Sequence, residues 1–466
     1  MSLADIVDLP ARRRRLVPPV PPRAADDISS WAVLRTIRKN ALGMWSQRAY
    51  EDEIIQSRFL GTNSFVLNSA DAIRHVLVDN YENYTRTPPT FRVLRPLLGD
   101  GLVIAEGRAW KHQRRTLAPA FTPRAVTPLL PHMVAVIDEM ITQLVTAGEQ
   151  PVDLWEAMHW MTLEIAGRTM FSFELGRRGA ELRELLMDYG LRLTRLHLLD
   201  LVLPRTWPSP RDWARARFRR RWTAFIGELM AERRAAGKNH GAPPRDLFDL
   251  LDTARDPETG EAFTDQQLGD EVATMMIAGH ETTATTLFWS LYLLALDPAT
   301  QQELAAEIQL ALQGAGAAGG IELERLRLTR AVIDETVRLY PPAYLIARQA
   351  KAPDVIAGLP VQRHDVMLIA PWLLHRHEKL WRDPNAFIPQ RFLPSAAPPE
   401  KFAYLPFGAG PRVCIGAHFA LVEATLALAK LIGAFRVELI DREPVLPVGV
   451  VTTQPDHAPR FRLTRR

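Results

Sequence analysis

The only cysteine of this 466-residue chain, Cys414, lies in a segment that could present a sulfur ligand. Two glycines and an arginine precede it in Phe407-Gly-Ala-Gly-Pro-Arg-Val-Cys414-Ile-Gly416, and a helix is expected to follow. The first N–H groups of a helix are unpaired and carry partial positive charge, so they favour the thiolate form of a nearby sulfur. Glycines let the backbone approach whatever the sulfur binds. The alternative is a small cysteine that fills a gap in the core.

A second segment pairs an acid with an alcohol inside a long predicted helix. Thr264 and Gln267 form a capping-box start and Pro298 marks the end, so we expect about 32 residues, or roughly 50 Å. In the middle stands Ala278-Gly-His-Glu-Thr-Thr283, whose glycine either permits close helix packing or leaves space for a flat ligand. The hydroxyl of Thr282 can bond to a carbonyl of the preceding turn and open the helix locally.

These two segments resemble signatures of the cytochrome P-450 family. The family's haem-ligand pattern is Phe-x-x-Gly-x-Arg-x-Cys-x-Gly, and its oxygen-binding motif is Ala/Gly-Gly-x-Asp/Glu-Thr. The resemblance implies haem b (iron protoporphyrin IX) with the Cys414 thiolate as the axial metal ligand. The other residues of these segments that it implies at the cofactor are Phe407, Gly408, Arg412, Gly416 and Ala278.

The resemblance also implies two catalytic residues, Glu281 and Thr282. Thr282 would hydrogen-bond dioxygen, and Glu281 would help to relay protons to it. For the neighbouring His280 and Thr283, pocket lining or plain packing is as good an interpretation as chemistry.

Four residues match the partners that the family uses for the two haem propionates, which demand cationic or donor groups. Trp110-x-x-x-Arg114 places an indole N–H and a guanidinium on one helix face. Arg348 lies where the chain leaves a Pro-Pro turn, and Arg412 lies two residues before the cysteine. The alternative for each is an ordinary surface residue.

Two further segments resemble a structural network of the family. Glu335-Thr-Val-Arg338 matches its Glu-x-x-Arg helix, and Arg391 lies in a segment that supplies the third member. The family commonly has glutamate where this chain has Gln390. The resemblance implies that these residues hold the cysteine loop and are not catalysts.

The resemblance implies a mostly α fold with a minor β-sheet region, in which haem lies between the long central helix and the thiolate-bearing helix. We expect residues 1–30 to form a basic, proline-rich tail and residues 31–466 a single haem domain. Helical periodicity dominates from about residue 105 onward. Short strands are expected near residues 64–67, 355–361 and 366–369, and again near the C-terminus. Residues 314–319 match a dinucleotide-binding fingerprint, but they follow a predicted helix and are therefore expected to form a loop.

Composition excludes several classes. The net charge of +4 comes without a clustered basic stripe or a recognition motif, which excludes nucleic-acid binding. One cysteine and no secretory signal favour a cytoplasmic protein. A membrane span needs roughly 18 continuous apolar residues. The closest stretch, Thr282–Leu296, is shorter, so we expect no transmembrane anchor. Arg12–Arg15 would form a solvated tail or touch anionic lipid, and His375 with His377 would make polar contacts because two histidines alone rarely bind a metal.

By resemblance, the chain is a monooxygenase that takes two electrons from a separate ferredoxin or flavodoxin with its reductase. It would hydroxylate an apolar terpenoid-, fatty-acid- or steroid-like molecule with dioxygen, and a monomer is assumed. Two alternatives are a peroxide-driven haem-thiolate enzyme and a haem-binding sensor or carrier without turnover. The pair Glu281-Thr282 argues against both, because neither needs such a proton relay.

Two sets of residues follow from this interpretation. A basic docking face for the electron donor would comprise Lys111, Arg115, Lys401 and Lys430. Arg92 and Arg95 could reach a substrate carboxylate, but a surface role is preferred for both. The residues expected to line the substrate pocket, with core packing as the alternative, are Phe91, Val93, Leu97, Leu98, Leu196, Leu198, Leu199, Ala343, Tyr344, Leu345, Ile346, Val450, Val451 and Thr452.

Overall fold

A computed structural model describes residues 15–26, 28–148, 150–172, 176–194, 199–200, 203, 207–237, 244–313 and 322–466. Helices dominate this part of the chain, as predicted. The longer ones are α1 (Ser30–Asn40), α3 (Pro88–Leu98), α4 (Gly107–Leu117), α6 (Leu130–Ala147), α7 (Leu154–Phe171), α8 (Gly176–Arg192), α10 (Pro210–Ala235), α12 (Asp265–Leu296), α13 (Pro298–Gln313), α14 (Arg327–Leu339) and α16 (Ala417–Ala434). The shorter ones are α2 (Ala70–Arg74), α5 (Pro123–Val126), α11 (Leu247–Thr253) and α15 (Pro371–Leu374).

The strands form small sheets at one side of the molecule and near the C-terminus. The largest sheet has the order β1-β2-β8-β5-β3, with β2 and β8 parallel and the other pairs antiparallel. Its strands are β1 (Ile54–Phe59), β2 (Thr62–Leu67), β8 (Val366–Ile369), β5 (Ile346–Ala350) and β3 (Tyr84–Thr85). The remaining strands are β4 (Val152–Asp153), β6 (Asp354–Ile356), β7 (Leu359–Val361), β9 (Phe435–Leu439), β10 (Pro447–Gly449), β11 (Thr453–Pro455) and β12 (Arg460–Arg465).

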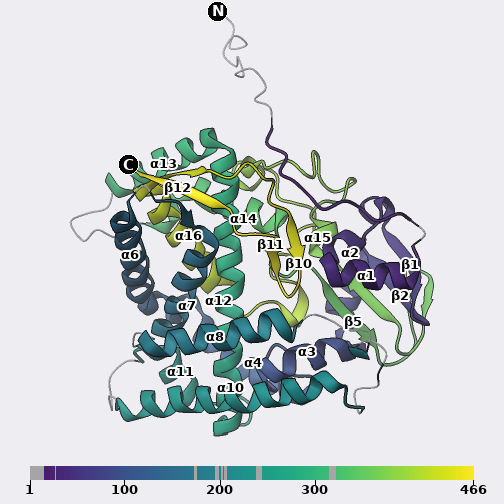
Figure 1. Cartoon of the computed structure of the whole chain (residues 1–466). Coiled ribbons are helices and arrows are strands. Elements are labelled where there is room, and N and C mark those ends of the chain that lie inside the picture. Colours follow the sequence, from purple (N-terminus) through teal and green to yellow (C-terminus); the bar gives the residue numbers. More distant parts are fainter. Residues whose placement is uncertain are drawn as a thin grey trace, which may run out of the picture.

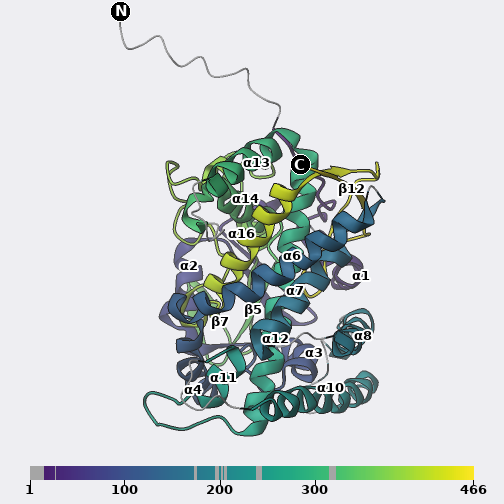
Figure 2. The same ribbon diagram turned by 90° about the vertical axis from the view of Figure 1, so that its left-hand side faces the viewer.

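Helix α12 is the axis of the fold. It spans 32 residues and runs through the molecule, with α6 and α7 on one side and the large sheet on the other (Figure 1). Thr264 and Gln267 form the predicted capping box, with each side chain bonded to the other residue's backbone N–H. Helices α7, α14 and α16 pack against α12, and Figure 2 shows α6, α7 and α16 crossing in front of it. The buried residues of these helices belong to one hydrophobic core.

The strand predictions near residues 64–67, 355–361 and 366–369 are confirmed by β2, by the β6–β7 hairpin and by β8. Strands β1 and β5 were not predicted. Both are half-buried with mixed polar and apolar residues, so their periodicity is weak. Residues 314–319 and most of the arginine run Arg12–Arg15 lie outside the described residues.

Among the described residues, two helical stretches reach the length and hydropathy of a membrane span, Pro123–Ala147 and Ala417–Ala434. Neither is the stretch Thr282–Leu296 that was named from the sequence, because that expectation considered only uninterrupted apolar runs. Residues Ala417–Ala434 form α16, whose apolar side chains lie largely in the core beside α12. A helix of the protein core can have the length and hydropathy of a membrane span, so these two properties do not by themselves make α16 one.

The described N-terminal segment is tied to later parts of the chain at several points. Of the predicted tail, Leu16 packs against the core and Arg15 forms an ion pair with Asp383. Asn40 joins α1 to the β10–β11 hairpin. Its side-chain amide donates to the carbonyl of Pro447 (2.9 Å), and its oxygen accepts from the N–H of Gly449 (3.0 Å).

Candidate active site

The cysteine loop is held by backbone turns that need glycine. Gly408 and Gly410 adopt φ values of +73° and +72°, in the left-handed region. A Cβ on Gly410 would lie 2.0 Å from the carbonyl oxygen of Leu77, so no other residue fits without a shift. The N–H of Cys414 donates to the carbonyl of Phe407 (2.9 Å), which closes the loop. Helix α16 begins three residues after the cysteine, as predicted.

The thiol of Cys414 lies open to a cavity but is surrounded by protein. Burial raises its pKa, while the backbone N–H of Gly416 and the charge of Arg114 lower it. The expected preference for the thiolate is therefore outweighed by desolvation. Arg114 also donates to the carbonyl of Val413 (2.8 Å), one residue before the sulfur.

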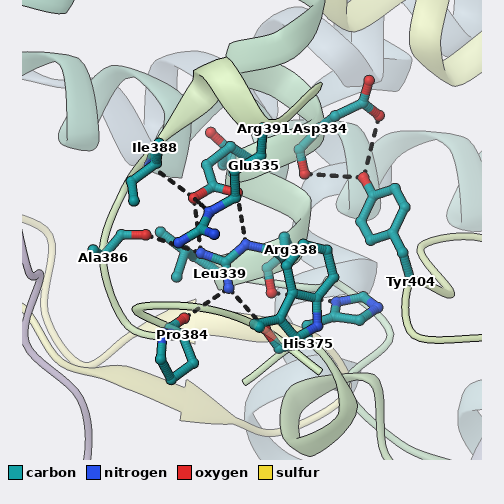
Figure 3. A network of polar contacts seen from close by, with 12 residues as sticks. Asp334, Glu335, Arg338, Leu339, His375, Pro384, Ala386, Ile388, Arg391 and Tyr404 are labelled. Carbon is teal, nitrogen blue, oxygen red and sulfur yellow. Dashed lines mark hydrogen bonds and ion pairs between the residues drawn. The ribbon is translucent and has the colours of Figure 1, made fainter. Parts of the chain in front are cut away.

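Behind the loop, Glu335 and Arg338 form a fully buried network on α14 (Figure 3). Arg338 makes a bidentate pair with Glu335 at 2.6 and 2.7 Å. Its other N–H groups donate to the carbonyls of His375, Pro384 and Ala386 at 2.7 to 2.9 Å. All five donors of the guanidinium are therefore used.

Arg391 lies at the edge of this network, with its Nε 3.5 Å from a carboxylate oxygen of Glu335 (Figure 3). His375 links the network to the cysteine loop. Its Nε2 accepts from the N–H of Leu405 (2.8 Å), and its Nδ1 lies 3.3 Å from the carbonyl of Arg338. Burial and the neighbouring arginines lower the pKa of His375 to about 3, so its ring is neutral. His375 and His377 make polar contacts as expected, and the described residues contain no group of three potential metal ligands.

A cavity of about 1120 Å³ lies between the cysteine loop and α12. Ala278, Gly279 and Thr282 form part of its α12 wall. A Cβ on Gly279 would meet no atom within 4 Å, so this glycine faces open space and not a packed helix. The Thr282 hydroxyl donates to the carbonyl of Ala278 (2.7 Å), which is the predicted contact. The predicted local opening is absent, because α12 is continuous through this turn.

Glu281 differs from its predicted place. It is not among the residues that line the cavity, although Ala278, Gly279, Thr282 and Thr283 of the same motif are. One carboxylate oxygen accepts from the hydroxyl of Thr452 (2.8 Å) and from the side-chain amide of Gln454 (3.0 Å). Successive residues on a helix lie about 100° apart, so the carboxylate is directed to the C-terminal hairpin while Thr282 faces the cavity.

The predicted propionate partners meet at one end of the cavity. Trp110, Arg114, Arg348 and Arg412 all line it. The guanidinium of Arg412 lies 4.4 Å from the centre of the Trp110 ring. Within the described chain, Arg348 donates only to the carbonyl of its neighbour Ala347 (3.0 Å). Burial, together with the charges of two nearby arginines, lowers the pKa of Arg348 to about 9.

Sequence reasoning missed a fourth arginine here. Arg86 lines the same cavity and shares the carboxylate of Glu106 with Arg412. This one carboxylate lies near three of the four cations, Arg86, Arg348 and Arg412. Burying unbalanced cations is costly, so the donor set fits a ligand that carries carboxylates, as haem does. The glycines and the open thiol complete the fit.

A buried acid was also missed. Glu423 on α16 and Thr283 on α12 both line the cavity and are nearly inaccessible to solvent. One carboxylate oxygen of Glu423 and the Thr283 hydroxyl lack a partner of normal geometry among the described residues. Burial raises the pKa of Glu423 far above its usual range. The signal was present in the sequence, since Glu423 is the only acid in the apolar run of α16.

The predicted pocket is partly confirmed. Phe91 borders a neighbouring pocket, Leu97 and Leu98 are core residues, and Leu199 is exposed. Leu196 and Leu198 lie outside the described residues. Thr452 binds Glu281 instead of lining the cavity. The predicted residues that do line it are Val93, Ala343, Tyr344, Leu345, Ile346, Val450 and Val451.

The proposed docking cations are mostly paired. Lys111 binds Glu82 (2.6 Å), Arg115 binds Asp256 (2.7 Å) and Lys430 binds Asp138 (2.8 Å). Lys401 lies 5.6 Å from the centre of the Phe402 ring. Arg92 and Arg95 also form ion pairs, so neither is directed to a substrate.

Comparison with known proteins agrees with this geometry. The chain is 30% identical to cyclooctat-9-en-7-ol 5-monooxygenase of Streptomyces melanosporofaciens over 390 residues, which cover 82% of each chain. It is 32% identical to cytokinin hydroxylase of Arabidopsis thaliana over 378 residues, covering 77% of this chain and 71% of the relative. The haem domain of cytochrome P450DA superposes with a TM-score of 0.78 at 24% identity, over 97% of this chain and 98% of that one. The sequence model named Cytochrome P450 matches residues 32–457, and the chain therefore belongs to the cytochrome P450 family of monooxygenases.

Proposed function

We propose that this protein hydroxylates an apolar small molecule, of terpenoid, fatty-acid or steroid type, with haem b bound through Cys414. The observation that carries the proposal is the cavity, which joins the cysteine loop, the four arginines described above and a largely apolar wall in one space. The names of the monooxygenase and hydroxylase relatives support the reaction type. The exact substrate is left to experiment.

The chain has side chains that could bind the iron and the propionates of the cofactor. Cys414 would hold the iron, while Trp110, Arg114, Arg348 and Arg412 would hold the propionates. When bound, the cofactor supplies dioxygen activation by two successive electrons, and a thiolate ligand favours cleavage of the O–O bond. The protein places the substrate and excludes water through its apolar wall.

Proton supply falls to α12. Thr282 carries its hydroxyl proton at the cavity surface, where it can turn from the Ala278 carbonyl toward a ligand. Glu281 is the nearest acid along the helix, and Glu423 is a second acid within the cavity wall. We assign the relay to Glu281 and Thr282, as the sequence motif suggests.

Electrons come, in this proposal, from a separate ferredoxin or flavodoxin with its reductase, because one cysteine cannot build an iron–sulfur cluster. A reducing compartment suits the single cysteine, which supports a cytoplasmic location. Ion pairs with carboxylates neutralise three of the four docking cations, so the donor is expected to depend most on Lys401.

The test is the absorption spectrum of the dithionite-reduced protein with carbon monoxide. We expect a strongly red-shifted Soret band that is absent in Cys414→Ser. A band at the ordinary imidazole-haem position, or no haem at all, contradicts the proposal. Turnover of apolar compounds with a surrogate electron donor then separates a monooxygenase from a carrier, and turnover by peroxide alone would favour the peroxide-driven alternative.

A further inference from the structure

The carboxylate of Glu281 is bound to a segment that is remote in sequence. Both of its hydrogen bonds come from the β10–β11 hairpin, from Thr452 at 2.8 Å and from Gln454 at 3.0 Å. Thr452 is almost fully buried, whereas Glu281 and Gln454 are half-buried. Hydrogen bonds to a charged acceptor are stronger than neutral ones. The hairpin therefore holds this acid in one orientation.

The same hairpin forms part of the cavity wall. Its tip residues Val450 and Val451 line the cavity, immediately before Thr452. The carbonyl of Val450 accepts from the Tyr344 hydroxyl (2.8 Å), and Tyr344 is also a wall residue. A ligand that fills this end of the cavity must touch the tip.

Both arms of the hairpin are anchored independently of the acid. The hydroxyl of Thr453 donates to the carbonyl of Pro341 (2.6 Å), and its carbonyl accepts from the Trp289 indole on α12 (2.8 Å). On the other arm, Asn40 holds Pro447 and Gly449, and the tip between these anchors is tied to the wall through Tyr344. Movement of the tip would therefore pivot near Thr453, which would carry Thr452 away from Glu281 and turn Gln454, on the other side of the pivot, out of its hydrogen bond.

We propose that Thr452 and Gln454 are positioning residues that keep Glu281 out of the cavity until substrate displaces the tip at Val450 and Val451. The proposal rests on the proposed function. Released from the hairpin, the carboxylate can turn toward Thr282, take up a proton from solvent water and pass that proton on there. An enzyme without substrate would keep its acid away from the reacting centre, and electrons would not be spent on dioxygen alone.

Linkage gives this proposal a test that does not depend on turnover. A ligand that must break the two hydrogen bonds binds more weakly by the free energy of those bonds. Removing them in the haem-loaded double variant Thr452→Val, Gln454→Leu should let a bulky apolar azole, clotrimazole, bind about tenfold more tightly. The measurement is an equilibrium titration followed by absorbance.

The Glu281→Ala background is the decisive control. Glu281→Ala alone should tighten clotrimazole binding by the same factor, and adding the two hairpin substitutions should then change nothing further. Thr452→Ser keeps the hydroxyl and should bind as the parent does. The small probe 4-phenylimidazole, which does not reach the tip, should bind all variants equally.

Three results would overturn the coupling. They are an unchanged or weaker affinity for clotrimazole in the double variant, an equal change with and without Glu281, and the same change for both probes. Each would be obtained with a protein that still shows the Cys414-dependent carbon monoxide band. Loss of that band in the parent protein would instead contradict the proposed function.

Discussion

The two sides of the cysteine loop differ in how their polar groups are satisfied. Behind the loop, Arg338 uses all five donors on Glu335 and three carbonyls, with no exposed atoms. On the cavity side, Arg348 binds only a neighbouring carbonyl, and Thr283 and Glu423 lie against each other with atoms that make no hydrogen bond of normal geometry among the described residues. The first region is complete as a protein structure. The second is complete only with a ligand, since buried polar groups are normally paired.

The largest effect should come from breaking the complete side. Arg338→Ala leaves the Glu335 carboxylate buried without its partner, which costs about 3–5 kcal/mol of unfolding free energy. Denaturant unfolding measures this cost. Arg325→Ala is the matched control, because Arg325 and Glu322 form the same i,i+3 pair on the surface and should contribute at most about 1 kcal/mol. Equal effects would mean that the buried pair contributes no more to the unfolding free energy than the surface pair does.

The two left-handed glycines before the cysteine allow the cost of a substitution to be compared within one loop. Gly410→Ala combines a left-handed φ with a clash against the carbonyl of Leu77, so we expect a loss above about 3 kcal/mol. Gly408→Ala has the same φ but only an ordinary contact with Ile346, at 3.8 Å, and should cost about 1–2 kcal/mol. Thermal unfolding of both variants checks the order, and a reversed order would contradict the geometry of the loop.

On the incomplete side, removing a cation should weaken haem binding without harming the fold. Arg348→Leu deletes an unbalanced buried charge, so the haem-free protein should be no less stable. Loss of one charge-assisted hydrogen bond, about 1.5–3 kcal/mol, should speed haem loss roughly tenfold to hundredfold. Transfer of haem to excess apomyoglobin measures the rate. The exposed Arg363→Leu is the control and should leave it unchanged.

Per pH unit, the smallest effect is a change in pH dependence at Glu423. Because burial raises its pKa in the folded state, the carboxyl contributes stability at acidic pH that is lost as pH rises above the ordinary value of 4.5. Glu423→Gln stays neutral and should remove this loss, which is at most about 1.4 kcal/mol per pH unit. Unfolding free energies at pH 5 and pH 8 test it. Parallel slopes for parent and variant would show that Glu423 is ionised in the fold.

The sequence predicted the complete side better than the incomplete one. Capping by Thr264 and the turn-forming glycines are local patterns whose consequences follow from spacing, and the role of the Glu335–Arg338 pair was implied by the resemblance to the family. The orientation of Glu281 depends on Thr452, a partner 171 residues away, and no local pattern encodes that contact. Arg86 was missed for the same reason, since only tertiary packing brings it to Arg412.

The predicted fold class is correct because helical periodicity is strong in most of this chain. Strands β1 and β5 were not predicted, because buried and exposed residues do not alternate regularly along them. Part of the substrate wall was placed correctly, at residues Ala343 to Ile346 and Val450 to Val451. The wrong members, Leu97 and Leu98, are apolar residues that pack into the core, and sequence alone does not separate a cavity wall from a core.

The clasp between Asn40 and the β10–β11 hairpin also sets a timetable for synthesis. Asn40 leaves the ribosome 409 residues before Gly449. At about 5–20 residues per second, its partner arrives roughly 20 to 80 seconds later. Until then the apolar cavity wall beside α1 lacks the β10–β11 hairpin. A nascent or C-terminally clipped chain would therefore carry the cysteine loop with an open side, and such a chain is a natural client for chaperones.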